Sequence, residues 1–212
     1  MTPRGKFITV EGTEGVGKTT NLEYIKSWLQ RNKIDFIATR EPGGTPLAEQ
    51  LRDLLLQPRN DETVAENAEL LMVFAARAQH LNQVIKPALE SGTWVLCDRF
   101  TDATYAYQGG GRCMDQATIA ILENLVQGDL RPDAVILLDV SVQIGLARAR
   151  GRGELDRFEQ EDVAFFERVR AAYRSRADGN SSYHVVDAGQ ELDRVQQQLA
   201  IVLEQLGKRW LP

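Results

Sequence analysis

The chain has 212 residues and a mass of 23.7 kDa, which fits one ordinary globular domain rather than two. Lys and Arg total 25 against 30 Asp and Glu, so the net charge is −5, and this acidic balance argues against nonspecific binding to nucleic acid. Two cysteines are too few for a disulfide framework, and the apolar runs, such as Ala134–Leu138, are far shorter than a membrane span. We therefore expect one domain over residues 1–212, in a cytoplasmic protein that binds neither nucleic acid nor membrane.

Five short runs of apolar or β-branched residues predict β-strands. In chain order they are Phe7–Glu11, Phe36–Glu41, Trp94–Arg99, Ala134–Val140 and Tyr183–Ala188. Several are apolar almost without alternation, which is typical of strands that are buried on both faces of a parallel sheet.

Apolar residues between these strands recur every three or four positions, as in amphipathic helices. The four clearest sets are Leu22, Ile25 and Leu29; Leu51, Leu54 and Leu55; Ile121, Leu122, Leu125 and Val126; and Leu192, Val195, Leu199, Val202 and Leu206. Alternating strands and helices predict an α/β fold, in which a doubly wound, five-stranded parallel sheet carries helices on both faces. In such a sheet, ligands bind beyond the carboxyl ends of the strands.

The first predicted strand is followed directly by GTEGVGKT at residues 12–19, a full match to the phosphate-binding pattern G-x-x-x-x-G-K-[ST]. Its glycines let backbone N–H groups approach phosphate oxygens, and the helix that begins there adds its positive end. Lys18 is expected to bridge the β- and γ-phosphates, and the Thr19 hydroxyl to hold Mg²⁺. The position between a strand and a helix disfavours a chance glycine-rich turn and predicts a P-loop NTPase. The expected nucleotide contacts come from Gly12, Thr13, Glu14, Gly15, Val16, Gly17, Lys18, Thr19 and Thr20.

The P-loop alone does not define the reaction. Residues 32–35 spell N-K-x-D, the pattern with which GTPases read guanine, but they end the first predicted helix instead of following a late strand. We interpret them as a solvated helix terminus that matches by chance.

Two arginines, Arg40 and Arg99, stand at the ends of the second and third predicted strands, on the edge that carries the P-loop. The rigid fork of Arg suits a phosphate dianion, so the pair predicts a second phosphorylated ligand. The alternative is a local salt bridge, of Arg40 with Glu41 or of Arg99 with Asp98. Asp98 is also well placed to order the water shell of Mg²⁺.

Four arginines lie within residues 148–157, interrupted by glycines at 151 and 153. Such a charge run is usually only a solvated face. Beside a phosphate site, however, it predicts an arginine-rich lid that closes over the charge that develops during phosphoryl transfer.

These segments, taken together, resemble one family, the bacterial thymidylate kinases, which phosphorylate dTMP with ATP in dTTP synthesis. The matching pieces run in family order, at residues 11–20, 40–45, 74–77, 98–100, 105–112 and 148–157. The combination is highly specific although each piece is short. Gly15 in the loop, together with an arginine-rich lid, looks like the bacterial arrangement.

The resemblance implies that Gly12–Thr19 hold the phosphates of ATP. Arg99 grips the dTMP phosphate with help from Arg40, in a pocket shaped by the backbone around Pro42. In the lid, at about residues 148–158, Arg150 and Arg152 reach the transferring phosphoryl group. The implied catalytic residues are Lys18, Arg99, Arg150 and Arg152.

The same resemblance assigns the nucleoside contacts. Glu14 contacts the sugar 3′-hydroxyl, and the ring of Tyr107 crowds the 2′ position. Arg77, Thr104 and Gln108 lie at the thymine edge. From the residues alone, plainer readings stay open: Arg77 as an exposed helix residue, Tyr107 as core, and Gln108 as a turn residue.

One position departs from the family pattern. The phenylalanine that stacks on the base usually precedes the arginine by four residues, where this chain has Val73. Phe74 precedes Arg77 by three, and both offsets lie on roughly the same helix face. We expect Phe74 at the thymine ring, with the choice between positions 73 and 74 left open.

The alternatives are another nucleoside monophosphate kinase of the same fold and, from a different class, a nucleotide-binding switch or scaffold ATPase. The family resemblance also implies a homodimer. The apolar stretch Ala68–Ala76 is a candidate face, although a fully buried core helix would have the same composition.

Overall fold

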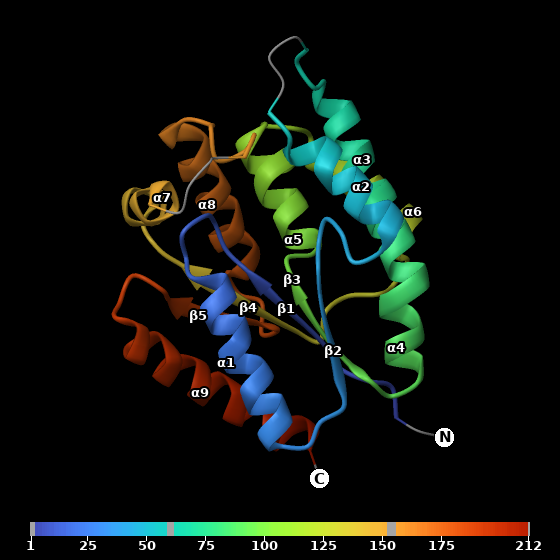
Figure 1. Cartoon of the computed structure of the whole chain (residues 1–212), viewed down its shortest axis with the longest axis vertical. Coiled ribbons are helices and arrows are strands. Elements are labelled where there is room, and N and C mark those ends of the chain that lie inside the picture. Colours follow the sequence, from blue (N-terminus) through green and yellow to red (C-terminus); the bar gives the residue numbers. More distant parts are fainter. Residues whose placement is uncertain (1–2, 59–61, 152–155, 212) are drawn as a thin grey trace.

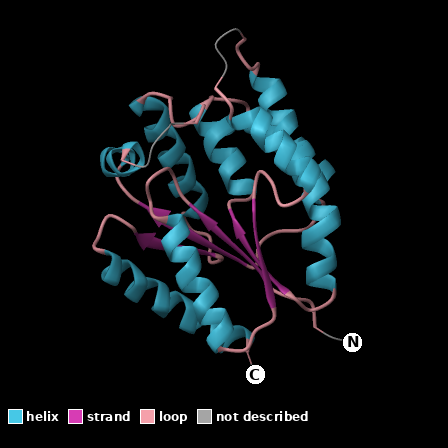
Figure 2. Cartoon of the chain, viewed as in Figure 1, coloured by secondary structure: helices cyan, strands magenta, loops and turns pink. Residues whose placement is uncertain are grey.

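The computed structural model describes residues 3–58, 62–151 and 156–211, and of Arg150 the backbone alone (Figure 1). A single sheet of five parallel strands, in the order β2-β3-β1-β4-β5, crosses the described part of the chain (Figure 2). The strands are β1 (Phe7–Glu11), β2 (Phe36–Arg40), β3 (Trp94–Asp98), β4 (Ala134–Asp139) and β5 (Tyr183–Asp187). The predicted doubly wound parallel sheet is confirmed.

Helices fill the connections between the strands. They are α1 (Lys18–Arg31), α2 (Pro46–Leu56), α3 (Glu66–His80), α4 (Lys86–Glu90), α5 (Thr101–Thr104), α6 (Gln116–Gln127), α7 (Val142–Arg150), α8 (Val163–Ala177) and α9 (Leu192–Trp210). Two π-helical segments, η1 (Leu81–Ile85) and η2 (Tyr105–Gly111), continue α3 and α5. None of these helices, which cover only the described residues, is long and apolar enough to cross a membrane.

Both faces of the sheet are covered by helices. Ile8 and Ile136 face α1 and α9, and pack against Ile25 of α1 and Leu199 of α9. Side chains of the alternate register, such as Leu137, face α8 on the opposite side of the sheet. This alternation explains why the central strands are mostly apolar: both of their faces are buried.

The strands end at one edge, and their register brings their loops together. Val10 of β1 and Arg40 of β2 both pair with Asp98 of β3, so the three following loops begin side by side. Four of the five predicted strands extend one residue too far, because the chain turns out of the sheet one residue earlier. After β3 the turn is sharp, since Arg99 has a left-handed backbone with φ of 66°. Residues 32–35 follow the end of α1, and three of the four are exposed, whereas Ile34 packs partly against the core.

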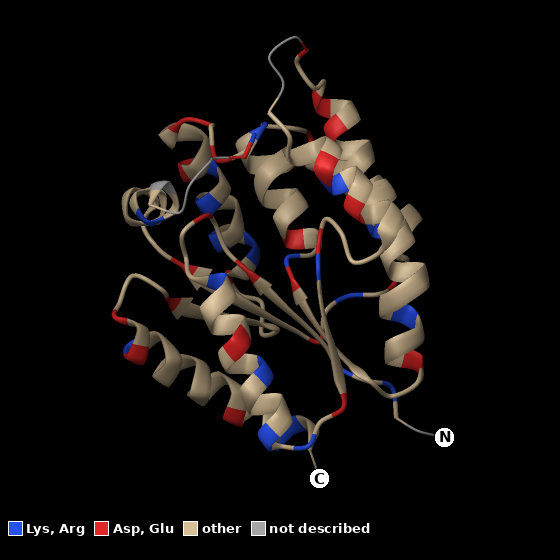
Figure 3. Ribbon diagram, in the orientation of Figure 1, with Lys and Arg blue, Asp and Glu red and all other residues tan. Residues whose placement is uncertain are grey.

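The segment η2 packs closely on α8 through its glycines. A Cβ atom on Gly110 would lie 2.8 Å from the Arg168 carbonyl oxygen, and one on Gly111 would lie 2.4 Å from the Phe165 ring. Basic residues of α8 (blue in Figure 3) tie the helix to the sheet: Arg170 pairs with Asp139 at 2.7 Å. The wide turn of a π-helix, held against α8, fixes where the side chains of η2 point.

Candidate active site

The loops after β1, β2 and β3 surround a cavity of about 630 Å³ at the carboxyl edge of the sheet. Most of the residues expected from the sequence line it. They are Glu14, Gly15, Val16, Gly17, Lys18, Thr19, Thr20, Pro42, Arg77, Asp98, Arg99, Thr104, Tyr107 and Gln108. Segments far apart in the sequence therefore contribute to one site, as the sheet topology requires.

The P-loop is arranged to receive an anion. Lys18 donates to the carbonyl oxygens of Gly12 and Thr13, both at 3.2 Å, so these two residues form the base of the loop behind the cavity lining. Burial, and then the nearby charge of Arg99, lower the pKa of Lys18. Helix α1 begins after Gly17 without a side-chain cap. The free N–H groups of its first turn favour a bound phosphate, and so does the Lys18 ammonium, whose charge is disfavoured until an anion binds.

Arg99 crosses the floor of the cavity. It donates to Glu14 at 2.6 Å and lies 4.8 Å over the ring of Tyr107, whose hydroxyl donates to the same Glu14 oxygen at 2.7 Å. The alternative pairing of Arg99 with Asp98 is not formed. An arginine, an acid and a phenol that the sequence analysis assigned to phosphate and sugar are thus in mutual contact.

A further arginine of the cavity is Arg52 of α2, which was not expected from the sequence. Arg40 lies outside the cavity, with its side chain 54% exposed and paired with Glu49 at 2.8 Å, so its expected place beside Arg99 is wrong. Arg52 donates to the Pro42 carbonyl oxygen at 2.9 Å and lines the cavity. Burial, and then repulsion by Arg40 and Arg99, lower the pKa of Arg52. A dianion bound between Arg52 and Arg99 would relieve this repulsion.

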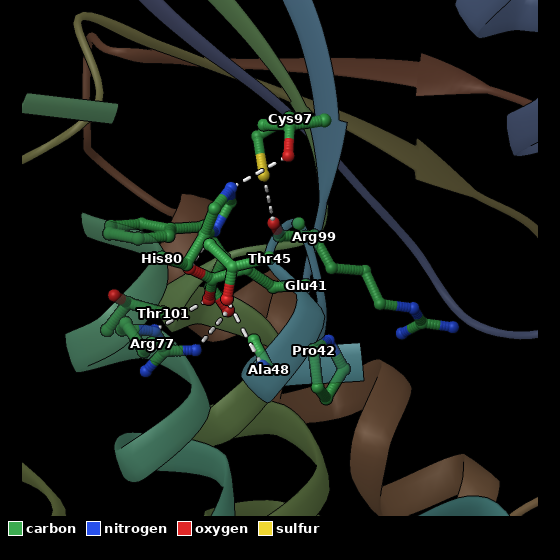
Figure 4. Close-up of polar contacts among 12 residues, drawn as sticks. Glu41, Pro42, Thr45, Ala48, Arg77, His80, Cys97, Arg99 and Thr101 are labelled. Atoms are coloured by element: carbon green, nitrogen blue, oxygen red, sulfur yellow. Dashed lines mark hydrogen bonds and ion pairs between the residues drawn. The ribbon is translucent and has the colours of Figure 1, made fainter. Parts of the chain in front are cut away.

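Arg77 is the most completely buried cation of the site, at 2% exposure (Figure 4). Its Nε donates to Glu41 at 2.7 Å, and its Nη2 donates to the Thr104 hydroxyl at 3.0 Å and to the Phe100 carbonyl oxygen at 3.1 Å. Its Nη1 is buried and finds no partner among the described residues. The reading of Arg77 as an exposed helix residue is therefore wrong, and one nitrogen remains for a ligand.

Glu41 holds Arg77 in place together with a histidine. Glu41 is hydrogen-bonded to His80 Nδ1 at 3.0 Å, and His80 Nε2 is hydrogen-bonded to the Thr39 hydroxyl at 2.7 Å. Figure 4 shows Glu41 between the side chains of Arg77 and His80. His80 therefore has a structural part: it holds Glu41 in place beside Arg77.

Phe74 lies in the core and not in the cavity lining. It packs with Leu70 and Tyr105, and the guanidinium of Arg77 lies 5.0 Å from its ring centre. Val73, at the position where the family pattern has phenylalanine, lines the cavity with Phe100. The expectation that Phe74 covers the base is corrected, because one residue of helix rotation turns its ring behind Arg77.

Thr19 and Asp98 supply oxygen atoms at the triphosphate end of the cavity. Asp98 Oδ1 is buried without a hydrogen-bond partner among the described residues, and Thr19 lines the cavity. No group of three or more His, Cys, Asp or Glu suited to a metal occurs in those residues. A hydroxyl and one carboxylate fit Mg²⁺, which keeps several waters and takes further oxygens from phosphates.

The lid region is described only in part. Arg152 lies outside the described residues, and so does the side chain of Arg150 at the end of α7. Arg148 lines the cavity and donates to the Ala188 carbonyl oxygen at 2.9 Å. Arg157 returns to the body of the protein, where it donates to the Leu55 carbonyl oxygen at 2.8 Å.

Fold and cavity together define a P-loop nucleotide-binding protein with a second cationic pocket beside the loop. The family model described as thymidylate kinase matches residues 10–199, and the chain belongs to the thymidylate kinase family. A thymidylate kinase of Teredinibacter turnerae is 62% identical over 201 residues, 94% of this chain and 98% of the relative. One of Pseudomonas putida is 59% identical over 200 residues, 94% of this chain and 95% of the relative. The crystal structure of the Ehrlichia chaffeensis enzyme, 33% identical, superposes with a TM-score of 0.75 over 95% of this chain and 99% of that one.

Glu11, at the end of β1, predicts a pH dependence of stability. It is fully buried, and it accepts from the Phe100 N–H at 2.7 Å and the Tyr173 hydroxyl at 3.0 Å. Burial, and then the charge of Asp102, raise its pKa from 4.5 to about 8. Between these pH values the folded state holds a proton that the unfolded state has lost. The free energy of unfolding should therefore fall as the pH rises through this window, by roughly 1 kcal/mol per pH unit.

Urea unfolding from pH 5 to 8 measures this slope. Glu11→Gln should flatten it, whereas Glu23→Gln on the surface of α1 should leave it unchanged. Equal slopes in the wild type and in Glu11→Gln would refute the assignment.

Proposed function

We propose that this protein transfers the γ-phosphoryl group of ATP to dTMP, giving ADP and dTDP. An oxygen of the dTMP phosphate forms the new bond to the γ-phosphorus, and the bond from that phosphorus to the bridging β-oxygen breaks. The acceptor is already anionic, so no general base is required. Positioning and charge neutralisation carry the reaction.

One observation carries this proposal: two half-buried arginines, Arg52 and Arg99, face a cavity that continues into the P-loop. Lys18 belongs to the triphosphate side, and Arg52 and Arg99 belong to the acceptor side. Arginine forks bind a phosphate dianion with two hydrogen bonds each. A switch ATPase has no use for this second cationic pocket, and the comparisons give no support for that alternative.

Thr19 and Asp98 would hold Mg²⁺, which supplies neutralisation of the β- and γ-phosphate charge. Val73 and Phe100 would form the apolar wall for thymine, and Arg77 Nη1 would donate to its edge. Glu14 and Tyr107 support the assigned sugar contacts, because they meet beside Arg99 in the cavity.

The arrangement of the whole molecule is also part of the proposal: one kinase domain in a cytoplasmic homodimer, with an arginine-rich lid at about residues 148–158. Leu71 of α3, and Ile121 and Leu125 of α6, support the dimer. They are 56%, 68% and 78% exposed, on two helices that pack on each other. Large apolar side chains grouped on a surface mark an interaction site. Within Ala68–Ala76, Leu70 and Val73 are buried, so that stretch is only partly exposed.

The first test is ADP production from ATP and Mg²⁺ with dTMP as acceptor. We expect strong turnover with dTMP and formation of dTDP, and much weaker turnover with GMP, AMP or water. A preference for another monophosphate would keep the phosphate sites and overturn the base site. Hydrolysis that ignores every acceptor would favour the switch.

A pair of variants tests the acceptor pocket. Arg52→Met should raise the KM for dTMP roughly 10- to 100-fold, because it removes a charge-assisted hydrogen bond. Arg40→Met should change it by less than about threefold, because this exposed side chain is paired with Glu49 outside the cavity. Steady-state kinetics with ATP held saturating measures both. The opposite ranking of the two variants contradicts the pocket as described.

The dimer is tested by sedimentation equilibrium. The wild type should show twice the chain mass of 23.7 kDa, and Leu125→Glu should show the single chain mass. Ile201→Glu, a similarly exposed apolar position on α9, is the control and should stay dimeric. A wild type that is monomeric at micromolar concentration counts against the dimer.

A further inference from the structure

A buried glutamate of α3 stands behind the base end of the cavity. Glu69 is 1% exposed, and its Oε1 accepts from the Gln108 side-chain Nε2 at 2.8 Å. Its Oε2 accepts from Arg157 Nη1 at 2.7 Å, and a second guanidinium, that of Arg112, lies 3.4 Å away. One carboxylate therefore joins three elements: α3, η2 and the segment that follows the lid.

This contact decides which way the Gln108 amide is turned. A carboxylate only accepts hydrogen bonds, so the amide must present its NH2 group to Glu69. Its carbonyl oxygen then lies on the other side, where it makes no hydrogen bond to a described residue. That oxygen is also not among the described buried polar atoms that lack a partner, and Gln108 lines the cavity. Gln108 thus offers the cavity an acceptor.

We propose that Glu69 is a specificity-determining positioning residue, which acts through Gln108 to select a base that carries a hydrogen on N3. The inference rests on the proposed function, since it concerns the pyrimidine of the acceptor nucleotide. Thymine and uracil offer an N3–H donor and an O4 acceptor, and cytosine has the reverse pattern. Arg77 can only donate and Gln108 is turned to accept, so this pair matches thymine or uracil and opposes cytosine.

The groups around Glu69 predict how the side-chain amide would be oriented in a Glu69→Gln variant. In Glu69→Gln the single oxygen should stay at the Oε2 position, where the guanidinium groups of Arg157 and Arg112 lie 2.7 and 3.4 Å away. The Oε1 position has only the longer contact with Arg112 Nε, at 3.4 Å, beside Gln108. The new NH2 group then faces Gln108, whose amide has to turn over to accept from it. Gln108 would present a donor to the cavity, which suits N3 of cytosine and not of thymine.

The experiment compares kcat/KM for dTMP, dUMP and dCMP in the full chain, for the wild type and Glu69→Gln. We expect the ratio of kcat/KM for dTMP to that for dCMP to fall by about tenfold or more. This is the usual effect of one mismatched hydrogen bond in a buried site. The dTMP to dUMP ratio and the KM for ATP should not change, because dUMP shares the N3–H. A dTMP to dCMP ratio equal to that of the wild type would overturn the proposal.

Two controls separate this role from a structural one. Arg112→Met removes a charge beside Glu69 and leaves the contact with Gln108, so it should preserve the dTMP to dCMP ratio. In a Gln108→Met background, Glu69→Gln should have no further effect on that ratio if it acts through the amide. A further tenfold fall in that background would overturn the proposal.

A measurement on the wild type covers the case in which Glu69→Gln does not fold. The Gln108 side-chain N–H signals should exchange slowly with water and stay so when dTMP binds, because they remain on Glu69. Signals that exchange freely, or that move onto the ligand, contradict the inferred orientation. An absence of dTMP turnover in the wild type would instead remove the proposed function itself, so the two failures are distinguishable.

Discussion

Two arginines of the cavity, Arg99 and Arg77, depend on carboxylates that lie beside them. Glu14 holds Arg99, and Glu41 holds Arg77, at 2.6 and 2.7 Å. An unpaired guanidinium could not be removed from water without a cost of several kcal/mol. Arg99 and Arg77 can be withdrawn from solvent because each has an acidic neighbour from another segment of the chain. Both acids stand in loops that follow strands: Glu14 in the P-loop after β1, and Glu41 directly after β2.

This pairing turns charges into oriented donors. A guanidinium clamped on one side offers its remaining N–H groups in a fixed direction, as Arg77 does with Nη1. Phe74 and Phe100, each with its ring centre 5.0 Å from that guanidinium, restrict it further. Such preorganisation lets a rigid site discriminate between bases that differ only in where they carry a hydrogen. Burial of the acids has its own consequence, visible in the raised pKa of Glu11.

The sequence was sufficient for the architecture and for the P-loop. Mostly apolar strands, helical spacing in the connections and a P-loop between β1 and α1 are local patterns, and the structure contains each predicted element. Predictions were wrong where the direction of a single side chain on a helix decides whether it reaches the cavity. Phe74 and Val73 are both apolar and both helical, and only the packing of α3 decides which one lines the cavity. Arg52 lies on α2, ten residues after Pro42. It reaches the cavity because it shares this helix with the cavity residues Leu55 and Leu56.

The sequence by itself determined the order of the strands and helices, the P-loop and the supply of arginines, because these follow from residue type and short-range spacing. Tertiary structure decided which arginine faces the acceptor pocket, which side chain forms the apolar wall and how the Gln108 amide is turned. Those outcomes depend on partners far apart in the chain, such as Glu69 with Gln108 and Glu41 with Arg77. No local pattern records such a contact, because it exists only once the helices have packed on the sheet.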